Sequence, residues 1–482
     1  MDNIEGRSLV NSMFSRAVAH SSGAGALRRF AMALMALTAA VTLVLTWPAQ
    51  TARAQGMSLI RDAEIENTIR DWATPLLRAA GVAPESVTLR MVNDDSLNAF
   101  VTLGNKMYLH TGLLMRSENP GQVIGVIAHE IGHIAGGHAV RLKDELERAR
   151  MLSLITSALG MAAAAGTGRG DVGSAVILGG SQAAMRNLFS YSRTQESSAD
   201  QAAIKYLRAT GQNADGLVEF FDILGDQEML LSSQQDAYAR THPLTRERIT
   251  SLEHAVEASD LPPAGDTAAD RMRHARMVAK LVGFLKTPGV TFQRYPETDT
   301  SLPARYARAI AWYRQGKLDE ALPVIDALLA DYPDDPYFHE LKGQMLLENG
   351  RVADSLSSYR RAVELAPREP LIRIALAHAL IETGDDSHLE AAREHLAQAV
   401  KEEPQAGFAW RLLATVHGRR GDMTMASYAM AESALLHGDP AQAAFHAERA
   451  ERGLKTGDPV WLRVQDVKQR ADTMMTEMKN DG

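Results

Sequence analysis

The chain has 482 residues, of which 45% are hydrophobic and 23% are charged. This length is too great for one hydrophobic core, and the composition is that of a globular protein rather than a disordered or fibrous one. The net charge of −8 argues against a nucleic-acid partner. The absence of cysteine excludes disulfides, cysteine-bound metal and a cysteine-linked lipid anchor.

The N-terminal segment has the pattern of a secretory signal. Residues 30–45 are uncharged and apolar, Arg28 and Arg29 precede them, and Ala52-Arg53-Ala54 offers the small residues of a cleavage site. The pattern predicts a signal peptide over residues 1–54 that is cut after Ala54. The alternative is a retained membrane anchor, because residues 30–52 carry no charge and are long enough to span a bilayer.

A small mixed α+β region follows this segment. Residues 60–80 have the periodicity of a helix, and residues 86–92 alternate like a strand. Residues 98–103 and 107–110 flank Gly104-Asn105, a two-residue turn signal, so we expect a β-hairpin or two neighbouring strands there.

The next helix carries the most informative motif of the chain. Asn119-Pro120 opens it with a capping residue and a first-turn proline. At 100° per residue, His133 lies about 40° and Glu130 about 100° from His129, so the three side chains project to one side. Two imidazoles one turn apart can bind one Zn²⁺, and the adjacent carboxylate can take a proton from a water molecule. The motif predicts peptide hydrolysis, against the alternative of an ordinary helix with polar residues.

A catalytic zinc site needs a third protein ligand. His138 would face the core side if the helix continued, and the metzincin pattern would place its histidine where this chain has Ala139, so we expect His138 not to bind the metal. Glu196 precedes Asp200 by one helical turn on a segment with apolar packing residues. Glu196 is the better third ligand, and Asp200 would orient a metal-bound histidine through a hydrogen bond. The alternative for this pair is a solvated face of an unrelated helix.

Two apolar segments, residues 152–165 and 172–184, lie between the two halves of this site. Each is too short to span a bilayer. We expect a buried or partly covered helical hairpin; the alternative is a surface that contacts a membrane or unfolded substrate.

The C-terminal part of the chain is repetitive. Residues 260–270 have the composition of a linker, and residues 271–285 that of a connecting helix. Gly316, Gly350 and Gly384 then follow one another at 34 residues, and the next repeat comes after 37, as three extra residues at 385–388 require. This period resembles that of tetratricopeptide repeats, which build a curved array able to hold a peptide or partner.

The ordered motifs His129-Glu-Ile-Gly-His133 and Glu196-Ser-Ser-Ala-Asp200, preceded by Asn98-Ala-Phe and Thr111-Gly-Leu-Leu, resemble those of the gluzincin peptidases of the HtpX and CAAX prenyl protease family over about residues 57–255. The resemblance implies one Zn²⁺ per chain, held by His129, His133 and Glu196, with Glu130 as general base and acid. It also implies that the strand around Asn98, Ala99 and Phe100 borders the cleft, where its edge can pair with an extended substrate.

His242 lies in a constrained His-Pro segment that, in the resembling family, is near the zinc. It could stabilise the developing oxyanion or occupy the open coordination position and keep the enzyme inactive. The alternative is an ordinary loop histidine. Arg246 and Arg248 follow in the same segment and could assist, but the sequence does not choose between them.

Together these patterns predict a mostly helical α+β gluzincin domain followed by an α-solenoid. The expected division is a signal peptide at 1–54, a zinc peptidase at 55–259, a linker and connecting helix at 260–302, and repeats at 303–475. A cleaved signal followed by repeats is similar to periplasmic members of the family in Gram-negative bacteria that degrade stalled outer-membrane β-barrel proteins and assist their assembly. That resemblance implies barrel-assembly machinery or client barrels as partners; the apolar hairpin adds a possible peripheral membrane contact, and a chaperone or scaffold with a silent site is the alternative.

Overall fold

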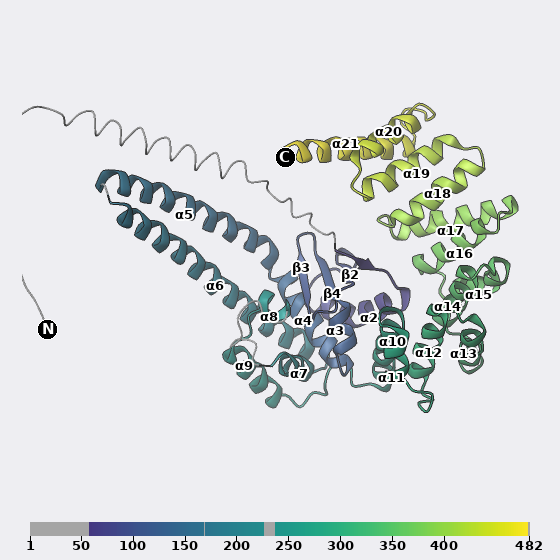
Figure 1. The fold of residues 1–482 in the computed structure, drawn as a ribbon, viewed down its shortest axis with the longest axis horizontal. Helices are drawn as coiled ribbons and strands as arrows, with labels where there is room; N and C mark the ends of the chain where they lie inside the picture. Colours follow the sequence, from purple (N-terminus) through teal and green to yellow (C-terminus); the bar gives the residue numbers. More distant parts are fainter. Residues whose placement is uncertain (1–56, 168, 226–236, 481–482) are drawn as a thin grey trace, which may run out of the picture. The chain divides into compact units, whose positions relative to one another are not determined.

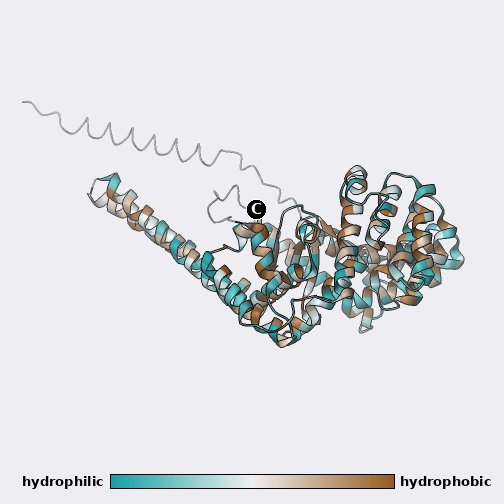
Figure 2. Ribbon diagram, turned by 90° about the horizontal axis from the view of Figure 1, so that it is seen from below, coloured by the Kyte–Doolittle hydropathy of each residue, from teal (hydrophilic) through white to brown (hydrophobic). Residues whose placement is uncertain are grey.

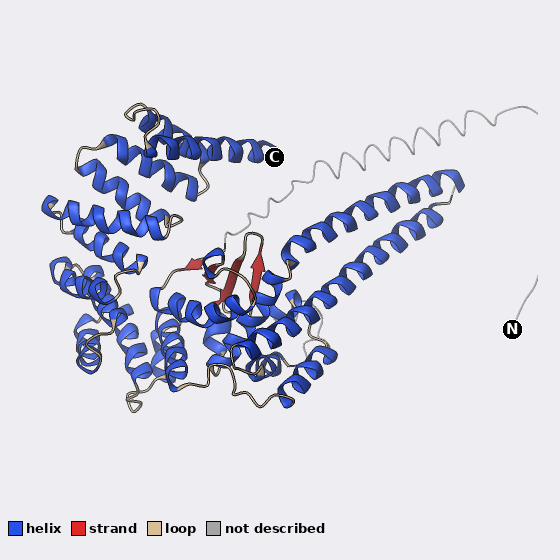
Figure 3. Cartoon of the chain, turned by 180° about the vertical axis from the view of Figure 1, so that it is seen from behind, coloured by secondary structure: helices blue, strands red, loops and turns tan. Residues whose placement is uncertain are grey.

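The computed structural model describes residues 57–167, 169–225 and 237–480, so the expected signal peptide lies outside the described residues. The chain from Ser58 onward forms one compact unit. It combines a small sheet, surrounded by helices, with a long series of paired helices (Figures 1 and 3). The predicted fold class is confirmed.

The sheet has four strands in the order β1-β2-β4-β3. The strands are β1 (Leu59–Ile60), β2 (Thr88–Val92), β3 (Ala99–Thr102) and β4 (Lys106–His110). β3 and β4 form the expected antiparallel hairpin, with Thr102 opposite Lys106. Three residues connect them rather than two, and Asn105 and Gly104 within this turn have positive φ, at 54° and 78°. Among the described residues β3 pairs only with β4, so its other edge is open to a further strand.

The central element of the peptidase part is α4 (Pro120–Ala135), which is capped by Asn119 as predicted: the Asn119 side chain accepts a hydrogen bond from the Gln122 amide. It lies among α2 (Ala63–Ala79), α6 (Gly170–Ala209), α7 (Asp215–Leu224) and β3. All its residues from Pro120 to His133 are buried. The shorter helices around it are α3 (Thr111–Arg116), α8 (Ala237–Thr241) and α9 (Arg246–Glu257).

The chain turns sharply after α4. Gly136 caps the helix, Gly137 has φ 63°, and α5 (His138–Thr167) starts directly afterwards. The assumption of a helix continuing through His138 is therefore wrong, and the direction derived from it does not apply. Gly137 ends the helix because it adopts the left-handed conformation, which glycine reaches at little cost.

α5 and α6 pack along each other as a long hairpin that extends away from the sheet (Figure 1). The hairpin is confirmed, and it is partly covered rather than buried: Leu154, Leu159 and Met161 are 59%, 57% and 63% exposed. The two helices cover only one face of each other, which leaves the remaining faces without a partner in the described part of the chain. None of the described helices has a stretch long and apolar enough to cross a membrane.

The repeats begin after α10 (Ala268–Leu285) and α11 (Pro288–Arg294). Gly316, Gly350, Gly384 and Gly421 all have φ between 71° and 80° and lie where one helix turns into the next, which explains their regular spacing. The three extra residues of the third unit form a short 3₁₀ turn at Asp386–His388. The repeat helices are α12 (Leu302–Arg314), α13 (Leu318–Asp331), α14 (Pro336–Glu348), α15 (Val352–Leu365), α16 (Pro370–Glu382), α17 (Leu389–Glu402), α18 (Gly407–Arg419), α19 (Met423–Leu436), α20 (Pro440–Glu451) and α21 (Pro459–Asn480).

A buried charge network joins the peptidase part to the first repeats. Lys280 on α10 lies 2.7 Å from an Asp62 carboxylate oxygen and 3.3 Å from Glu64 Oε2. Arg276, one turn earlier, donates to Glu64 at 2.7 Å and to Asp335 at the start of α14 at 2.5 Å. Lys280 and Glu64 are only 4% and 5% exposed, so each charge depends on the others for compensation.

Removing one charge from this network should destabilise the fold strongly. We expect Lys280→Met to lower the free energy of unfolding by about 3–5 kcal/mol, because it removes one of the two cations that compensate the buried carboxylates of the network. Lys342→Met is the matched control, since Lys342 pairs with Asp326 at the surface and such pairs contribute about 0–1 kcal/mol. Urea unfolding measures both, and equal losses in the two variants would contradict the role given to Lys280.

Candidate metal centre

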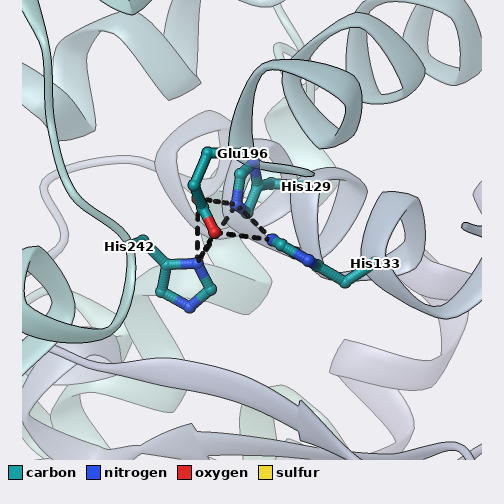
Figure 4. Close-up of side chains that lie close together, drawn as sticks. All are labelled: His129, His133, Glu196 and His242. Atoms are coloured by element: carbon teal, nitrogen blue, oxygen red, sulfur yellow. Dashed lines mark hydrogen bonds and ion pairs between the residues drawn. The ribbon is translucent and has the colours of Figure 1, made fainter. Parts of the chain in front are cut away.

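Four buried side chains from three segments converge on one point (Figure 4). His129 and His133 come from α4, Glu196 from α6, and His242 from the segment that follows α8. Each offers one ligand atom, and these atoms all lie within 4.8 Å of one another. The structure thus brings together the three residues predicted to bind zinc and the histidine predicted near it.

The two α4 histidines point their Nε2 atoms at each other, 3.0 Å apart. Their other ring nitrogens are occupied: His129 Nδ1 lies 2.9 Å from Asp200 Oδ1, and His133 Nδ1 lies 2.9 Å from His138 Nδ1. Because a carboxylate only accepts, His129 carries its proton on Nδ1 and leaves Nε2 free as a ligand. Such partners fix the tautomer and ring direction of metal-binding histidines.

Glu196 closes the third side of the cluster. Its Oε2 lies 3.3 Å from His129 Nε2, and its Oε1 lies 3.4 Å from His133 Nε2. Burial would raise the pKa of this carboxyl, but His242 and the hydrogen bonds from the other two histidines hold it well below its usual range. Glu196 is therefore ionised, as a metal-binding carboxylate must be.

His242 completes the group from the opposite side. Its Nδ1 lies 3.1 Å from Glu196 Oε2 and 3.4 Å from His129 Nε2, while its Nε2 is 3.2 Å from the Ala99 carbonyl oxygen of β3. The Tyr238 ring stacks on it at 4.6 Å. The Ala99 carbonyl and the Glu196 carboxylate can both only accept, so each ring nitrogen of His242 faces an acceptor, and Nδ1 is the atom directed at the ligand cluster.

Glu130 lies beside the cluster without taking part in it. It is fully buried, and neither carboxylate oxygen has a hydrogen-bond partner among the described residues. Burial raises its pKa above the usual range for a glutamate. A buried carboxylate is expensive to leave unpaired, so this site is suited to an additional polar group such as a water molecule next to a bound cation.

Arg248 on α9 supports the centre from behind. Its Nε and Nη2 donate to Asp200 at 2.6 and 2.8 Å, and its Nη1 lies 3.2 Å from Glu196 Oε2. Burial would raise the pKa of Asp200, but these bonds and the one with His129 lower it. Arg246, which the sequence left as an equal candidate, is exposed.

The donor set fits a zinc ion. Imidazole nitrogens with one carboxylate oxygen are the ligands that Zn²⁺ takes in catalytic sites. Burial lowers the pKa of His133 to about 3, so this ring is neutral and ready to bind. Burial also opposes a charge on His129, yet its hydrogen bonds with Asp200 and Glu196 raise that pKa to about 9, so a proton has to leave as a cation enters.

Residues 59–256 match the profile of Peptidase family M48. The repeats match a tetratricopeptide repeat profile over residues 292–345 and the Cytochrome c-type biogenesis protein H TPR domain over residues 325–442. The chain therefore contains an M48 peptidase domain and tetratricopeptide repeats, and it is a metalloendopeptidase.

Three curated relatives are similar to parts of this chain. The chain is similar to the beta-barrel assembly-enhancing protease of Yersinia pestis, with 26% identity over 83% of this chain and 82% of the relative. It is also similar to the protein of the same name from Escherichia coli K12, with 24% identity over 83% of this chain and 81% of the relative. The metalloprotease LoiP of E. coli K12 is 29% identical over 37% of this chain and 65% of LoiP. The predicted resemblance is confirmed.

Sequence reasoning missed three side chains that shape the centre. His138 was considered only as a ligand and lies instead against His133; Tyr238 carried no motif; Arg248 could not be separated from Arg246. The glycine pair before His138 was a signal for the first, because it indicates a helix break that redirects the chain.

Loss of the hydrogen bond behind His129 should weaken metal binding. We expect Asp200→Asn to reduce zinc affinity about 10- to 100-fold. The uncharged amide lacks the negative charge that favours the Nδ1-protonated ring of His129 and that pairs with Arg248. Competition with a chromophoric zinc chelator measures the affinity. Asp222→Asn, at an exposed position of α7, is the matched control, and unaltered affinity in the Asp200 variant would contradict this role.

Proposed function

We propose that this chain is a zinc-dependent endopeptidase that binds one Zn²⁺ on His129, His133 and Glu196. The observation that carries the proposal is the convergence of these buried donors next to the unpartnered Glu130 carboxylate. Bound Zn²⁺ supplies a Lewis acid that polarises a peptide carbonyl and makes water acidic near neutral pH.

Glu130 acts as general base and then general acid. Its carboxylate takes a proton from the attacking water and returns that proton to the leaving amine, so that one group serves both halves of the reaction. The raised pKa caused by burial suits this cycle, because it brings proton acceptance and donation closer to neutral pH.

The substrate binds as an extended strand along β3. This strand has an open edge among the described residues, and its Ala99 lies against the metal centre through His242. Main-chain hydrogen bonds from an added strand hold a peptide without regard to its sequence and place its carbonyl beside Glu130. Unfolded chains with exposed backbone are the natural substrates of such an edge.

His242 is a plug in the resting state. Its Nδ1 is directed at the ligand cluster, where it can occupy the fourth position on a bound zinc ion, and its Nε2–H donates to the Ala99 carbonyl, which an incoming strand would otherwise use. An oxyanion donor would need that proton directed at the substrate instead. The chain is therefore a latent peptidase until the segment holding His242 moves away.

The biological setting follows from the relatives and the domain order. We propose a periplasmic enzyme, exported by a signal peptide cut after Ala54, with a peptidase at 55–259, a connection at 260–302 and repeats at 303–475. Its clients are stalled or misassembled outer-membrane β-barrel proteins, and its repeats dock clients or the assembly machinery. The names of the relatives and the match to tetratricopeptide repeats support this setting. The alternative is a chaperone or scaffold for outer-membrane assembly. The observation in its favour is the position of His242 next to the ligand cluster.

Replacing the general base separates chemistry from binding. We expect Glu130→Gln to reduce cleavage of unfolded casein at least 100-fold while zinc binding is retained, because the amide cannot accept the proton of water. Glu118→Gln, at an exposed position just before α4, is the matched control. Wild-type cleavage by the Glu130 variant would refute the mechanism, and its complementation of a barrel-assembly defect would favour the chaperone function.

Removal of the plug gives a prediction of opposite sign. We expect His242→Ala to increase casein cleavage several-fold at unchanged zinc content, because it frees the fourth position and the Ala99 carbonyl together. His254→Ala, which alters an exposed histidine of α9, should leave the rate unaltered. A decreased rate would instead support the oxyanion role, and no change would remove His242 from the site.

A further inference from the structure

The outer half of the α5–α6 hairpin is apolar and largely uncovered. Residues 151–168 and 172–185 contain no charged side chain. Figure 2 shows hydrophobic residues spread over this part of the hairpin. Its exposed large side chains, between 48% and 63% accessible, are Met151, Leu154, Ile155, Leu159, Met161, Leu178, Met185 and Phe189. A patch of this length in water indicates a binding surface.

The two helices pack through small residues and keep their large ones outside. A Cβ on Gly173 would lie 2.5 Å from the Gly160 carbonyl oxygen, and one on Gly180 would lie 2.3 Å from the Thr156 side chain. Such close backbone packing needs no large side chains in the seam. Exposed apolar side chains therefore occur on both helices. Docking into a groove of a partner protein would instead use one apolar face.

The two threonines on this half bond to their own helix. Thr156 Oγ1 donates to the Leu152 carbonyl at 3.0 Å, and Thr167 Oγ1 donates to the Ala163 carbonyl at 2.6 Å. At the tip Arg169 and Asp171 form an ion pair at 2.6 Å, which cancels their charges. Hydroxyls bonded to their own helix can enter an apolar medium without losing a partner.

The charge of the hairpin is opposite to that of the whole chain. Residues 138–195 carry seven basic and four acidic side chains, a net of +3, while the chain carries −8. Arg148, Arg150 and Arg186 lie within three residues of the apolar half on the side toward the peptidase, and the exposed Arg148 also pairs with Glu145 at 2.6 Å. Basic residues at the end of an apolar segment are attracted to anionic lipid headgroups, each by about 1 kcal/mol.

We propose that the outer half of α5–α6 inserts into a bilayer surface containing anionic lipids, with the three arginines at the headgroups. Residues 151–167 extend about 25 Å, against a hydrocarbon core of about 30 Å, so the hairpin enters the bilayer without crossing it. This inference goes beyond the peptidase function and does not depend on it. α6 continues from the apolar half to Glu196, so the membrane-bound hairpin holds the metal centre near the bilayer.

The lack of cysteine permits a site-specific test on the full chain. A single cysteine replaces Leu159 or Leu178 on the hairpin and carries an environment-sensitive fluorophore. Phe445 on α20 and Val140 at the base of α5 are control positions, because they are 55% and 57% exposed but lie outside the apolar half. The probes are vesicles of phosphatidylglycerol and phosphatidylcholine, vesicles of phosphatidylcholine alone, and unfolded casein. Far-UV circular dichroism establishes that each labelled variant is folded.

We expect a blue shift and a several-fold gain in emission at 159 and 178 with the anionic vesicles, quenching by a quencher placed in the acyl chains, and no comparable change at 140 or 445. The changes should be weaker with neutral vesicles. No change at 159 and 178 with anionic vesicles would overturn the proposal, even if the chain binds them through its N-terminal segment. A response to casein but not to vesicles would overturn it too and assign the surface to clients.

The arginines provide a second readout with a matched control. We expect the triple variant Arg148→Gln, Arg150→Gln, Arg186→Gln to need at least tenfold more anionic lipid for half of the emission change at 159. Three surface arginines of the repeats, the exposed Arg351 and the partly exposed Arg361 and Arg393, changed together to glutamine, should leave this concentration unaltered. Equal behaviour of the two triple variants would contradict the headgroup contact.

Discussion

The metal centre depends on how closely α4 and α6 approach each other. A Cβ on Gly132 would lie 2.8 Å from the Ala199 carbonyl oxygen, a distance that carbon and backbone oxygen do not tolerate. Only glycine therefore lets α6 pack directly beside the two histidines. Ala199 lies between Glu196 and Asp200, so this one contact brings the third ligand to the Nε2 side of His129 and the orienting carboxylate to its Nδ1 side.

Around this contact each charged or polar donor has a fixed partner. Asp200 is held by Arg248 and in turn holds His129, while the turn after α4 brings His138 against His133. Glu130 differs, because its oxygens have no hydrogen-bond partner among the described residues, and its ion-pair neighbour there is His242 Nε2 at 3.5 Å. The centre thus combines rigid ligands with one reactive group kept apart from them, which is the arrangement that preorganised catalysis requires.

The extent of successful prediction followed the range of the interactions involved. Local patterns were sufficient for the Asn119 cap, the β3–β4 hairpin and the 34-residue repeat, because each depends on neighbouring residues. The placement of Glu196 beside α4 needed motif order as well, since packing between distant segments is not encoded in any single stretch. The sequence left open how far the hairpin is covered, because apolar composition normally indicates burial but does not reveal how many neighbours a helix has. The predicted direction of the His138 side chain was wrong because Gly137 ends the helix before it.

The hairpin is continuous in the chain with the helices that carry the metal ligands. α5 leaves the peptidase two residues after the end of α4, and α6 returns with Glu196 and Asp200, so the excursion connects the two halves of the ligand set. The repeats are joined to the same domain through the buried Lys280 network. The most direct test of the account is zinc K-edge X-ray absorption of the purified chain. One zinc ion bound by three imidazoles and one carboxylate is predicted; a chain without bound zinc, or with zinc lacking imidazole ligands, would contradict it.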